Sequence, residues 1–134
     1  MTDLMHAVLE HREAQGPALR SMMAMLELEP SDAREWFALM RRRYPDDRVV
    51  FVYFIQCNGP KGPIKIGIAR DVRKRIAHLR IANPYKLVAL VAVEAPITTE
   101  SLLHGKFLKH RIRGEWFRPA RPLLKFIEEL KVDQ

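Results

Sequence analysis

The chain has 134 residues and a formal net charge of +7, with 48% apolar and 29% charged residues. This length suits one domain with its own core and is short for two independent domains. No apolar run approaches the roughly 20 residues that a membrane-spanning helix needs, and the N-terminus lacks the layout of a secretory signal. The single cysteine, Cys57, excludes a disulfide framework and is expected to be a small core residue in a cytoplasmic protein.

The basic residues are unevenly distributed along the chain. Residues 1–48 hold seven arginines and nine acidic residues, whereas residues 49–134 hold sixteen basic and seven acidic residues. The basic excess therefore belongs to the second part. It favours a polyanionic partner, because each Lys or Arg that neutralises a phosphate releases a condensed counterion. Charge alone leaves simple solubility open as the other explanation.

Three helices are predicted before the basic part of the chain. The first two span residues 3–14 and 17–29 and have helical apolar spacing. The third follows a capping sequence at Ser31-Asp32 and ends near Arg43, because the residue before Pro45 is disfavoured in the α region. We divide the chain into a helical N-terminal extension, residues 1–48, and a second domain that follows it.

Two functions are considered for this extension. Residues 17–43 have the layout of a helix-turn-helix DNA reader, but their acidic balance is poor for DNA. A helical cap or a dimerisation arm that packs through Trp36 and Phe37 is favoured. A homo-oligomer held together by the N-terminal helices is therefore one expectation.

The second domain, residues 49–134, is predicted to be α+β, with a small, mainly antiparallel three-stranded sheet flanked by helices. The first two strands form a hairpin around the turn-forming sequence at residues 58–63. The third is the longest apolar run and is expected to be central. The predicted strands are residues 49–56, 64–69 and 86–95, and the predicted helices are residues 71–80, 99–110 and 122–131.

Four features of this domain have chemical interest when they are taken together. The hairpin holds Tyr53 and Lys65 on paired strands, and the helix after it contains Arg75 in a basic run. A later helix places Glu100 and His104 on one face at i, i+4 spacing. The fourth feature is the turn sequence Gly-Glu-Trp-Phe at residues 114–117.

Each of these residues also has a purely structural explanation. Tyr53 fits a solvent-facing position on a sheet, and Lys65 and Arg75 fit a solvated basic surface. Glu100 suits the first turn of a helix by complementing the helix dipole. His104 has no second His, Cys or Asp at zinc spacing, and neither has His78. The joint spacing of the residues is what favours a functional interpretation.

The spaced elements resemble the GIY-YIG nuclease superfamily, and most closely its compact branch from phage and mobile elements. Residues 52–55, Val-Tyr-Phe-Ile, are similar to the first signature strand, and residues 65–67, Lys-Ile-Gly, to the second. Arg75 lies eight residues beyond Gly67, which matches the catalytic arginine of that superfamily. Glu100 matches its metal-binding glutamate. The resemblance covers about residues 50–130.

Two positions depart from the pattern of that superfamily. Phe51 stands where the signature has its first glycine, a change that is common in the compact branch. Lys65 replaces the second signature tyrosine. Some restriction enzymes of the superfamily use lysine at this position, so the change does not exclude activity.

The resemblance implies a metal-dependent endonuclease that hydrolyses phosphodiester bonds in DNA, with RNA as an alternative substrate. Tyr53 would accept the proton of the attacking water, with its phenolic pKa lowered by the cation of Lys65. Arg75 would stabilise the phosphorane, and Glu100 would bind Mg²⁺ or Mn²⁺. The residues predicted to contact the nucleic acid are Lys61, Arg70, Arg73, Lys74, His78 and His104.

A second hypothesis belongs to a different class of function. In a catalytically silent DNA-binding module the basic surface would be kept without cleavage. The presence of Lys65 instead of tyrosine is the feature that favours this hypothesis.

Overall fold

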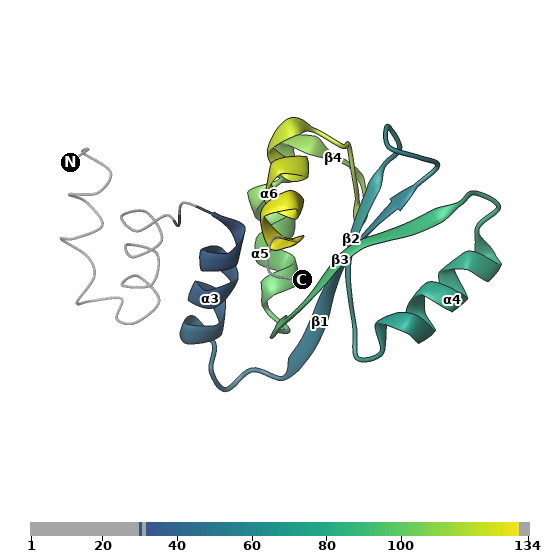
Figure 1. The fold of residues 1–134 in the computed structure, drawn as a ribbon. Coiled ribbons are helices and arrows are strands. Elements are labelled where there is room, and N and C mark those ends of the chain that lie inside the picture. The colour runs from purple at the N-terminus through teal and green to yellow at the C-terminus, as the bar shows by residue number, and fades with distance from the viewer. Residues whose placement is uncertain (1–29, 31, 132–134) are drawn as a thin grey trace. The chain divides into compact units, whose positions relative to one another are not determined.

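The computed structural model describes residue 30 and residues 32–131. These residues form an α+β unit with four α-helices and a five-stranded sheet (Figure 1). The α+β class agrees with the prediction, whereas the expectation of three strands was wrong. The elements in chain order are α3 (Ala33–Arg43), β1 (Val49–Cys57), β2 (Ile64–Ala69), α4 (Val72–Ala82), β3 (Leu87–Pro96), α5 (Thr99–Lys106), a 3₁₀ turn η1 (Leu108–His110), β4 (Arg111–Arg113), β5 (Trp116–Phe117) and α6 (Arg121–Lys131).

The hairpin of β1 and β2 is confirmed, and its loop is held by one buried side chain. The two strands are antiparallel, with Tyr53 opposite Gly67 and Ile55 opposite Lys65. At the loop, the amide of Gln56 donates to the Gly62 carbonyl at 2.9 Å and to the Pro60 carbonyl at 3.0 Å. Because these bonds satisfy the carbonyls of the loop, the Gly- and Pro-rich segment has a defined conformation.

The position of β3 in the sheet corrects a second expectation. The strand order is β3-β1-β2-β5-β4, so β3 pairs with β1 alone and lies at an edge. Its apolar run was taken as evidence for a central strand. The run reflects instead the helices that contact this strand, because Leu87, Val91 and Ala95 are buried among them. The apolar content of a strand indicates whether its two faces are buried. It does not indicate whether the strand pairs with one neighbouring strand or with two.

Strands β4 and β5 were not predicted from the sequence. They have three and two residues, too few for a periodic pattern, and β4 is the basic sequence Arg-Ile-Arg. Gly114 forms the turn between them with a φ of +54°, a conformation that favours glycine. The predicted helix over residues 99–110 is correspondingly shorter, because α5 ends at Lys106 and the chain turns into this small hairpin.

The helices cover the two faces of the sheet separately (Figure 1). Helix α4 begins at the predicted cap, where the Asp71 carboxylate accepts from the Lys74 N–H at 3.1 Å. Its Ile76 packs with Tyr53 and Ile55 on one face. On the other face, the Phe126 ring of α6 contacts Phe54 from the sheet. The core therefore has one part on each side of β1.

Helix α3 belongs to the same compact unit as the sheet, which begins at Asp32. Its cap is Asp32, whose carboxylate accepts from the Glu35 N–H at 2.9 Å. The rings of Trp36 and Phe37 pack against Phe126 of α6, with centroids 5.8 and 6.1 Å away. The third predicted helix is thus packed against the domain and not separate from it. The helices predicted over residues 3–14 and 17–29 lie outside the described residues. The structure therefore does not test the helix-turn-helix and homo-oligomer hypotheses, which depend on them.

In the part of the chain that the structure describes, no helix has the length and apolar composition needed to cross a membrane.

Candidate functional site

Tyr53 and Gly67 are the first two residues of the candidate site, and they contact each other across the β1–β2 hairpin. They are direct partners in the β1–β2 ladder, and the Tyr53 ring lies across β2 at the glycine. A Cβ atom at position 67 would lie 2.5 Å from Tyr53 Cζ, a distance that real Cβ atoms do not reach. Tyr53 is 2% exposed. Gly67 therefore provides the space that the tyrosine ring occupies.

Lys65 lies on the same face of β2 and is fixed by an ion pair. Its ammonium donates to Glu115 Oε2 at 2.8 Å, and the Lys65 side chain is only 12% exposed. The same ammonium lies 5.9 Å from the centroid of the Trp116 ring. Glu115 reaches this place because the backbone of the β4–β5 turn bonds to β2, with the Ile66 N–H donating to the Glu115 carbonyl at 3.0 Å.

Helix α5 supplies the remaining acidic side chain and a histidine. Strand β5 pairs with only the first two residues of β2, which leaves the rest of that edge to α5. There the His104 Nε2–H donates to the Ile66 carbonyl at 2.9 Å. Glu100, His104 and Glu115 bring one potential ligand atom each to within 4.8 Å of one another. The side chains of two segments thus form a compact cluster, which we call the carboxylate cluster.

The two carboxylates of the cluster have pKa values that are shifted in opposite directions. Burial, and then the hydrogen bond to Glu115, raises the pKa of Glu100 to about 7. Burial alone would also raise the pKa of Glu115, but the hydrogen bonds from Lys65 and Glu100 outweigh it and lower this pKa. The shifts have opposite directions because the ammonium of Lys65 bonds to Glu115 and not to Glu100. At neutral pH a proton therefore resides on Glu100 for a large part of the time.

These side chains fit a divalent cation. Glu100 Oε2 is buried, and no group in the described part of the chain donates a hydrogen bond to it. Carboxylate oxygens are the ligands that Mg²⁺ and Mn²⁺ prefer. The bond from His104 to the Ile66 carbonyl has the form of a metal-binding histidine that donates its other N–H to the backbone. Glu100, predicted as the metal residue, thus lies beside two further potential ligands.

The predicted activation of Tyr53 by Lys65 disagrees with the electrostatics of the site. Burial raises the pKa of Tyr53 to about 12, and Glu115 and Glu100 add to the increase. Arg75 opposes it, and Lys65 is not among the causes. The charge of Lys65 is compensated by its ion pair with Glu115 and therefore does not lower the pKa of the phenol. Tyr53 is therefore a neutral phenol at physiological pH.

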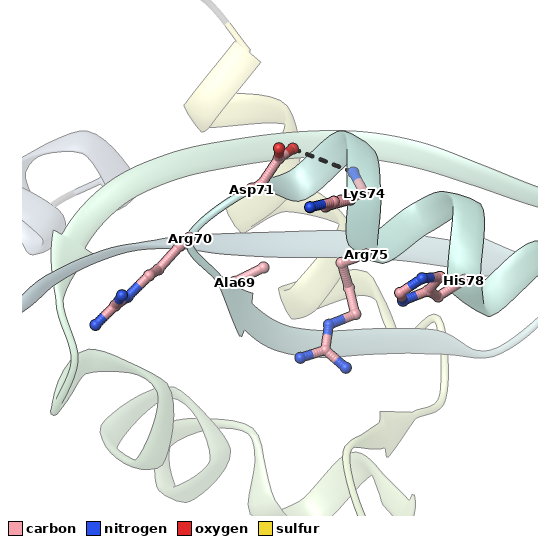
Figure 2. Close-up of a pocket in the computed structure, with 6 residues that line it drawn as sticks. All are labelled: Ala69, Arg70, Asp71, Lys74, Arg75 and His78. Atoms are coloured by element: carbon pink, nitrogen blue, oxygen red, sulfur yellow. Dashed lines mark hydrogen bonds between the residues drawn. The ribbon is translucent and has the colours of Figure 1, made fainter.

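Arg75 comes from α4 and lines a basic pocket of about 260 Å³ (Figure 2). The Asp71 carboxylate turns back to the Lys74 N–H, whereas the Arg75 guanidinium points away from the helix. Arg75 is close enough to Tyr53 to lower its pKa. The pocket is lined by Ala69, Arg70, Asp71, Lys74, Arg75 and His78.

The predicted nucleic-acid contacts fall into three groups. Three of them, Arg70, Lys74 and His78, line the basic pocket together. Two others are exposed elsewhere, Lys61 in the β1–β2 loop and Arg73 on α4. His104 lies in the carboxylate cluster instead.

Glu115 is the residue of the cluster that sequence reasoning missed. It was interpreted as an ordinary turn residue, and it contacts Lys65 and Glu100. Sequence separation concealed it, since fifty positions lie between Lys65 and Glu115. Its signal was the turn sequence Gly-Glu-Trp-Phe, which was noticed without a role being given to the acid.

The fold and the site define the chain as an α+β domain with a carboxylate cluster and a basic pocket, and Arg75 of this pocket acts electrostatically on Tyr53. The family model of the T5orf172 domain matches residues 50–131, and the chain belongs to this family. This membership gives the chain a DNA-related function. No curated protein and no solved structure matches the chain.

The family match corrects the resemblance drawn from the sequence. T5orf172 is a family distinct from the GIY-YIG nucleases, so the assignment to that superfamily was wrong. The residues that suggested it have local structural causes. Gly67 makes room for the ring of Tyr53, and Asp71 caps the helix that contains Arg75. Such requirements of packing and capping do not by themselves identify a family.

Proposed function

We propose that this chain is a metal-dependent endonuclease that hydrolyses phosphodiester bonds in DNA. One observation supports this most strongly: Tyr53, Lys65, Arg75 and Glu100 come from four different elements, Lys65 bonds to Glu115 of the carboxylate cluster, and the charges of Arg75, Glu100 and Glu115 all act on Tyr53. Hydrolysis of a phosphodiester needs an oriented water, compensation of charge at the phosphorane and help for the leaving oxygen. The site has one type of side chain for each of these tasks.

Arg75 and Glu100 would act on the phosphate. The guanidinium of Arg75 presents its planar donors to the non-bridging oxygens, a geometry that lysine lacks. Glu100 would hold Mg²⁺ or Mn²⁺. The cation, when bound, polarises the phosphate and neutralises the negative charge of the leaving oxygen.

Tyr53 and Lys65 would orient and activate the attacking water. With a pKa of about 12 the phenol is neutral in the unliganded protein, so it first acts as a hydrogen-bonding group. Burial is the largest cause of this raised pKa, and Glu115 and Glu100 add to it. Neutralising these carboxylates would remove their part of the increase and leave the charge of Arg75 to oppose the effect of burial.

The DNA backbone would lie along the basic pocket. Arg70, Lys74 and His78 line this pocket beside Arg75, so a strand bound there would place a phosphate next to the cluster. Phosphate contacts of this kind fix the position of the strand and depend on salt. We place the activity in the cytoplasm, in line with the single cysteine. RNA is the alternative substrate.

A specific observation favours a second function, that of a catalytically silent DNA-binding module. Tyr53 is 2% exposed, and Lys65 is engaged by Glu115. Under this hypothesis both residues serve packing and electrostatics, and the basic pocket binds DNA without cleavage. The two functions differ in one result, because only the nuclease changes the topology of supercoiled DNA.

The test uses supercoiled plasmid with Mg²⁺, with Mn²⁺ and with EDTA. We expect nicking or linearisation with a cation, and a loss on the order of 10²-fold or more in Arg75→Ala and Glu100→Ala. Arg75→Lys should fail as well, since it keeps the charge and loses the planar fork. Lys125→Ala, an exposed cation of α6, is the matched control and should cut like the parent.

Two results would argue against the proposal. Cleavage that is equal in the parent, Arg75→Ala and Glu100→Ala would remove the assigned roles. A salt-dependent shift of DNA without cleavage under any cation would favour the silent module.

A further inference from the structure

Glu115 has no role in the proposed hydrolysis, although it is at the centre of the site. Its carboxylate accepts from Lys65 at 2.8 Å, and one of its oxygens lies within 4.8 Å of potential ligand atoms of Glu100 and His104. It also acts electrostatically on Tyr53. Gly114 with its positive φ already allows the turn to form. The position of Glu115 therefore needs another explanation.

The charges of the cluster do not balance. The cluster contains two carboxylates, and among the described residues the one ammonium that bonds to it, from Lys65, bonds to Glu115. One negative charge is left to be compensated by a proton or by a cation. Two neighbouring carboxylates cannot both ionise at low cost without such a partner. The position of least compensation is Glu100 Oε2, which is buried and receives no hydrogen bond.

The remaining member of the cluster is a histidine whose ring is held in place by two contacts. The Nε2–H of His104 donates to the Ile66 carbonyl, which leaves the other ring nitrogen without a proton in the neutral imidazole. The His104 ring is also fixed by the Phe117 ring, with centroids 5.2 Å apart. An oriented imidazole beside two carboxylates is a donor set for a divalent cation.

We propose that Glu115 and Glu100 bind one divalent cation together, with His104 beside them, and that this cation displaces the ammonium of Lys65 from Glu115. The inference rests on the metal dependence in the proposed function and adds a second carboxylate to it. Lys65 is then the counter-charge that compensates Glu115 in the absence of the cation. Its release would leave the ammonium free to contact a phosphate.

The opposite charges of Lys65 and Glu115 predict opposite effects on cation affinity. Removing the carboxylate in Glu115→Gln should weaken binding at least about tenfold, as losses of supporting groups at metal sites do. Removing the competing ammonium in Lys65→Met should strengthen binding by about tenfold, since a nearby unit positive charge is lost. If the Glu115–Lys65 pair had only a structural role, both substitutions would weaken the pair equally. The two variants would then not differ in cation affinity in this way.

Trp116 makes the test direct. Its ring lies 5.9 Å from the Lys65 ammonium and it adjoins Glu115, so a lanthanide in the cluster would be excited through this indole. The full chain is titrated with Tb³⁺ under tryptophan excitation, and bound Tb³⁺ is then displaced with Mn²⁺. Trp116→Phe should remove the sensitised emission. Trp36→Phe, on the opposite face of the sheet, should retain it.

Matched controls keep the result independent of folding. Glu94→Gln changes an exposed glutamate of β3 and should bind like the parent. Circular dichroism checks that each variant is folded. If Glu115→Gln is unstable because Lys65 loses its partner, the double variant Lys65→Met with Glu115→Gln replaces it. That variant should bind the cation more weakly than Lys65→Met alone.

The inference and the proposed function fail in different ways. Unchanged Tb³⁺ and Mn²⁺ affinity in folded Glu115→Gln would overturn the inference, even if the protein cleaves DNA with a cation. Binding that requires Glu115 in a protein that never cleaves DNA would support the inference and argue against the nuclease. Emission that survives Trp116→Phe would place the cation elsewhere and overturn the inference as well.

Discussion

The ring of Tyr53 lies over Gly67, its direct partner on the neighbouring strand, and occupies the space that a side chain at position 67 would fill. The two residues therefore depend on each other, since the tyrosine needs a glycine and the glycine has no other steric reason to be there. Gly67 has no positive φ, so its requirement is one of space and not of backbone conformation. The position of the Tyr53 hydroxyl near the carboxylate cluster follows from this pairing.

The first prediction concerns Gly67→Ala. A Cβ atom 2.5 Å from Tyr53 Cζ must displace the ring, which has buried neighbours on β1 and α4. We expect a loss of about 1–3 kcal/mol in the free energy of unfolding, as for other overpacked cores. Chemical denaturation measures it.

Gly105→Ala is the matched control for this substitution. Apart from its chain neighbours and the nearby backbone of its own helix, no atom of the described residues lies within 4 Å of a Cβ placed at Gly105 in α5. Alanine should stabilise this helix by about 0.5–1 kcal/mol relative to glycine. Equal effects of the two substitutions would contradict the steric explanation.

The second prediction is a pH dependence of stability that arises from Glu100. The pKa of this carboxyl is about 7 in the folded protein and 4.5 in the unfolded chain, so the folded state binds the proton more tightly. The contribution to stability is fully present below about pH 4.5 and is lost as the pH rises through 7. In EDTA, Glu100→Gln should therefore be more stable than the parent at pH 8 by about 1–2 kcal/mol, and nearly equal at pH 4.5.

Thermal unfolding at pH 4.5, 6 and 8 gives this comparison. Glu94→Gln serves as the control, because Glu94 is exposed on β3 and outside the carboxylate cluster. A gain in stability that is the same at all three pH values would show that the cause is not the ionisation of Glu100.

The third prediction concerns the basic pocket and the salt dependence of DNA binding. Arg70→Ala and Lys74→Ala each remove one cation from its lining. We expect each to lower the affinity for DNA and to reduce the slope of log K against log salt by about 0.9, the value for one lost phosphate contact. Fluorescence anisotropy between low and moderate salt measures both quantities.

Lys125→Ala removes an exposed cation from α6 and has no part in this pocket. Its affinity and its salt slope should equal those of the parent. If all three substitutions reduce the affinity equally, the pocket has no special role and the effect is one of overall charge.

The fourth prediction tests the packing of α3 onto the domain. Phe37 is 1% exposed and contacts the rings of Trp36 and Phe126. Phe37→Ala should lower the free energy of unfolding by about 3–5 kcal/mol, the cost of a large cavity in a core. Arg42→Ala, on the exposed side of the same helix, should change it by less than about 0.5 kcal/mol.

This experiment also bears on the division of the chain at residue 48. If Phe37→Ala had no effect on stability, α3 would be an appendage of the domain. A large effect would mean that the folding unit includes the helix, as its contacts with α6 indicate.

The elements with strong local signals were predicted correctly from the sequence. The hairpin of β1 and β2 has β-branched strands around a Gly- and Pro-rich turn. The cap of α3 is Asp32, one of the two predicted candidates, and the cap of α4 is Asp71 as expected. Their local interactions are largely independent of the rest of the chain. Strands β4 and β5 have no such signal, because strands of three and two residues form only against the existing edge of β2.

The candidate site divides in the same way. Tyr53, Lys65, Arg75 and Glu100 were selected for their spacing, and the fold brings them near one another. The partner of Lys65 was not predicted, because no spacing rule connects two residues fifty positions apart. The direction of the shift in the pKa of Tyr53 was predicted wrongly for the same reason, since it depends on burial and on Glu115.

The sequence by itself determined the α+β class, the main helices, the hairpin and the basic character of the second part of the chain. These properties depend on side-chain periodicity, on caps and turns, and on composition, all of which are local. The tertiary structure alone decided that β3 is an edge strand, that Gly67 accommodates Tyr53 and that Glu115 joins Glu100 and Lys65. Burial and charge pairing act between residues that are distant in sequence, and only the folded chain places these residues in contact.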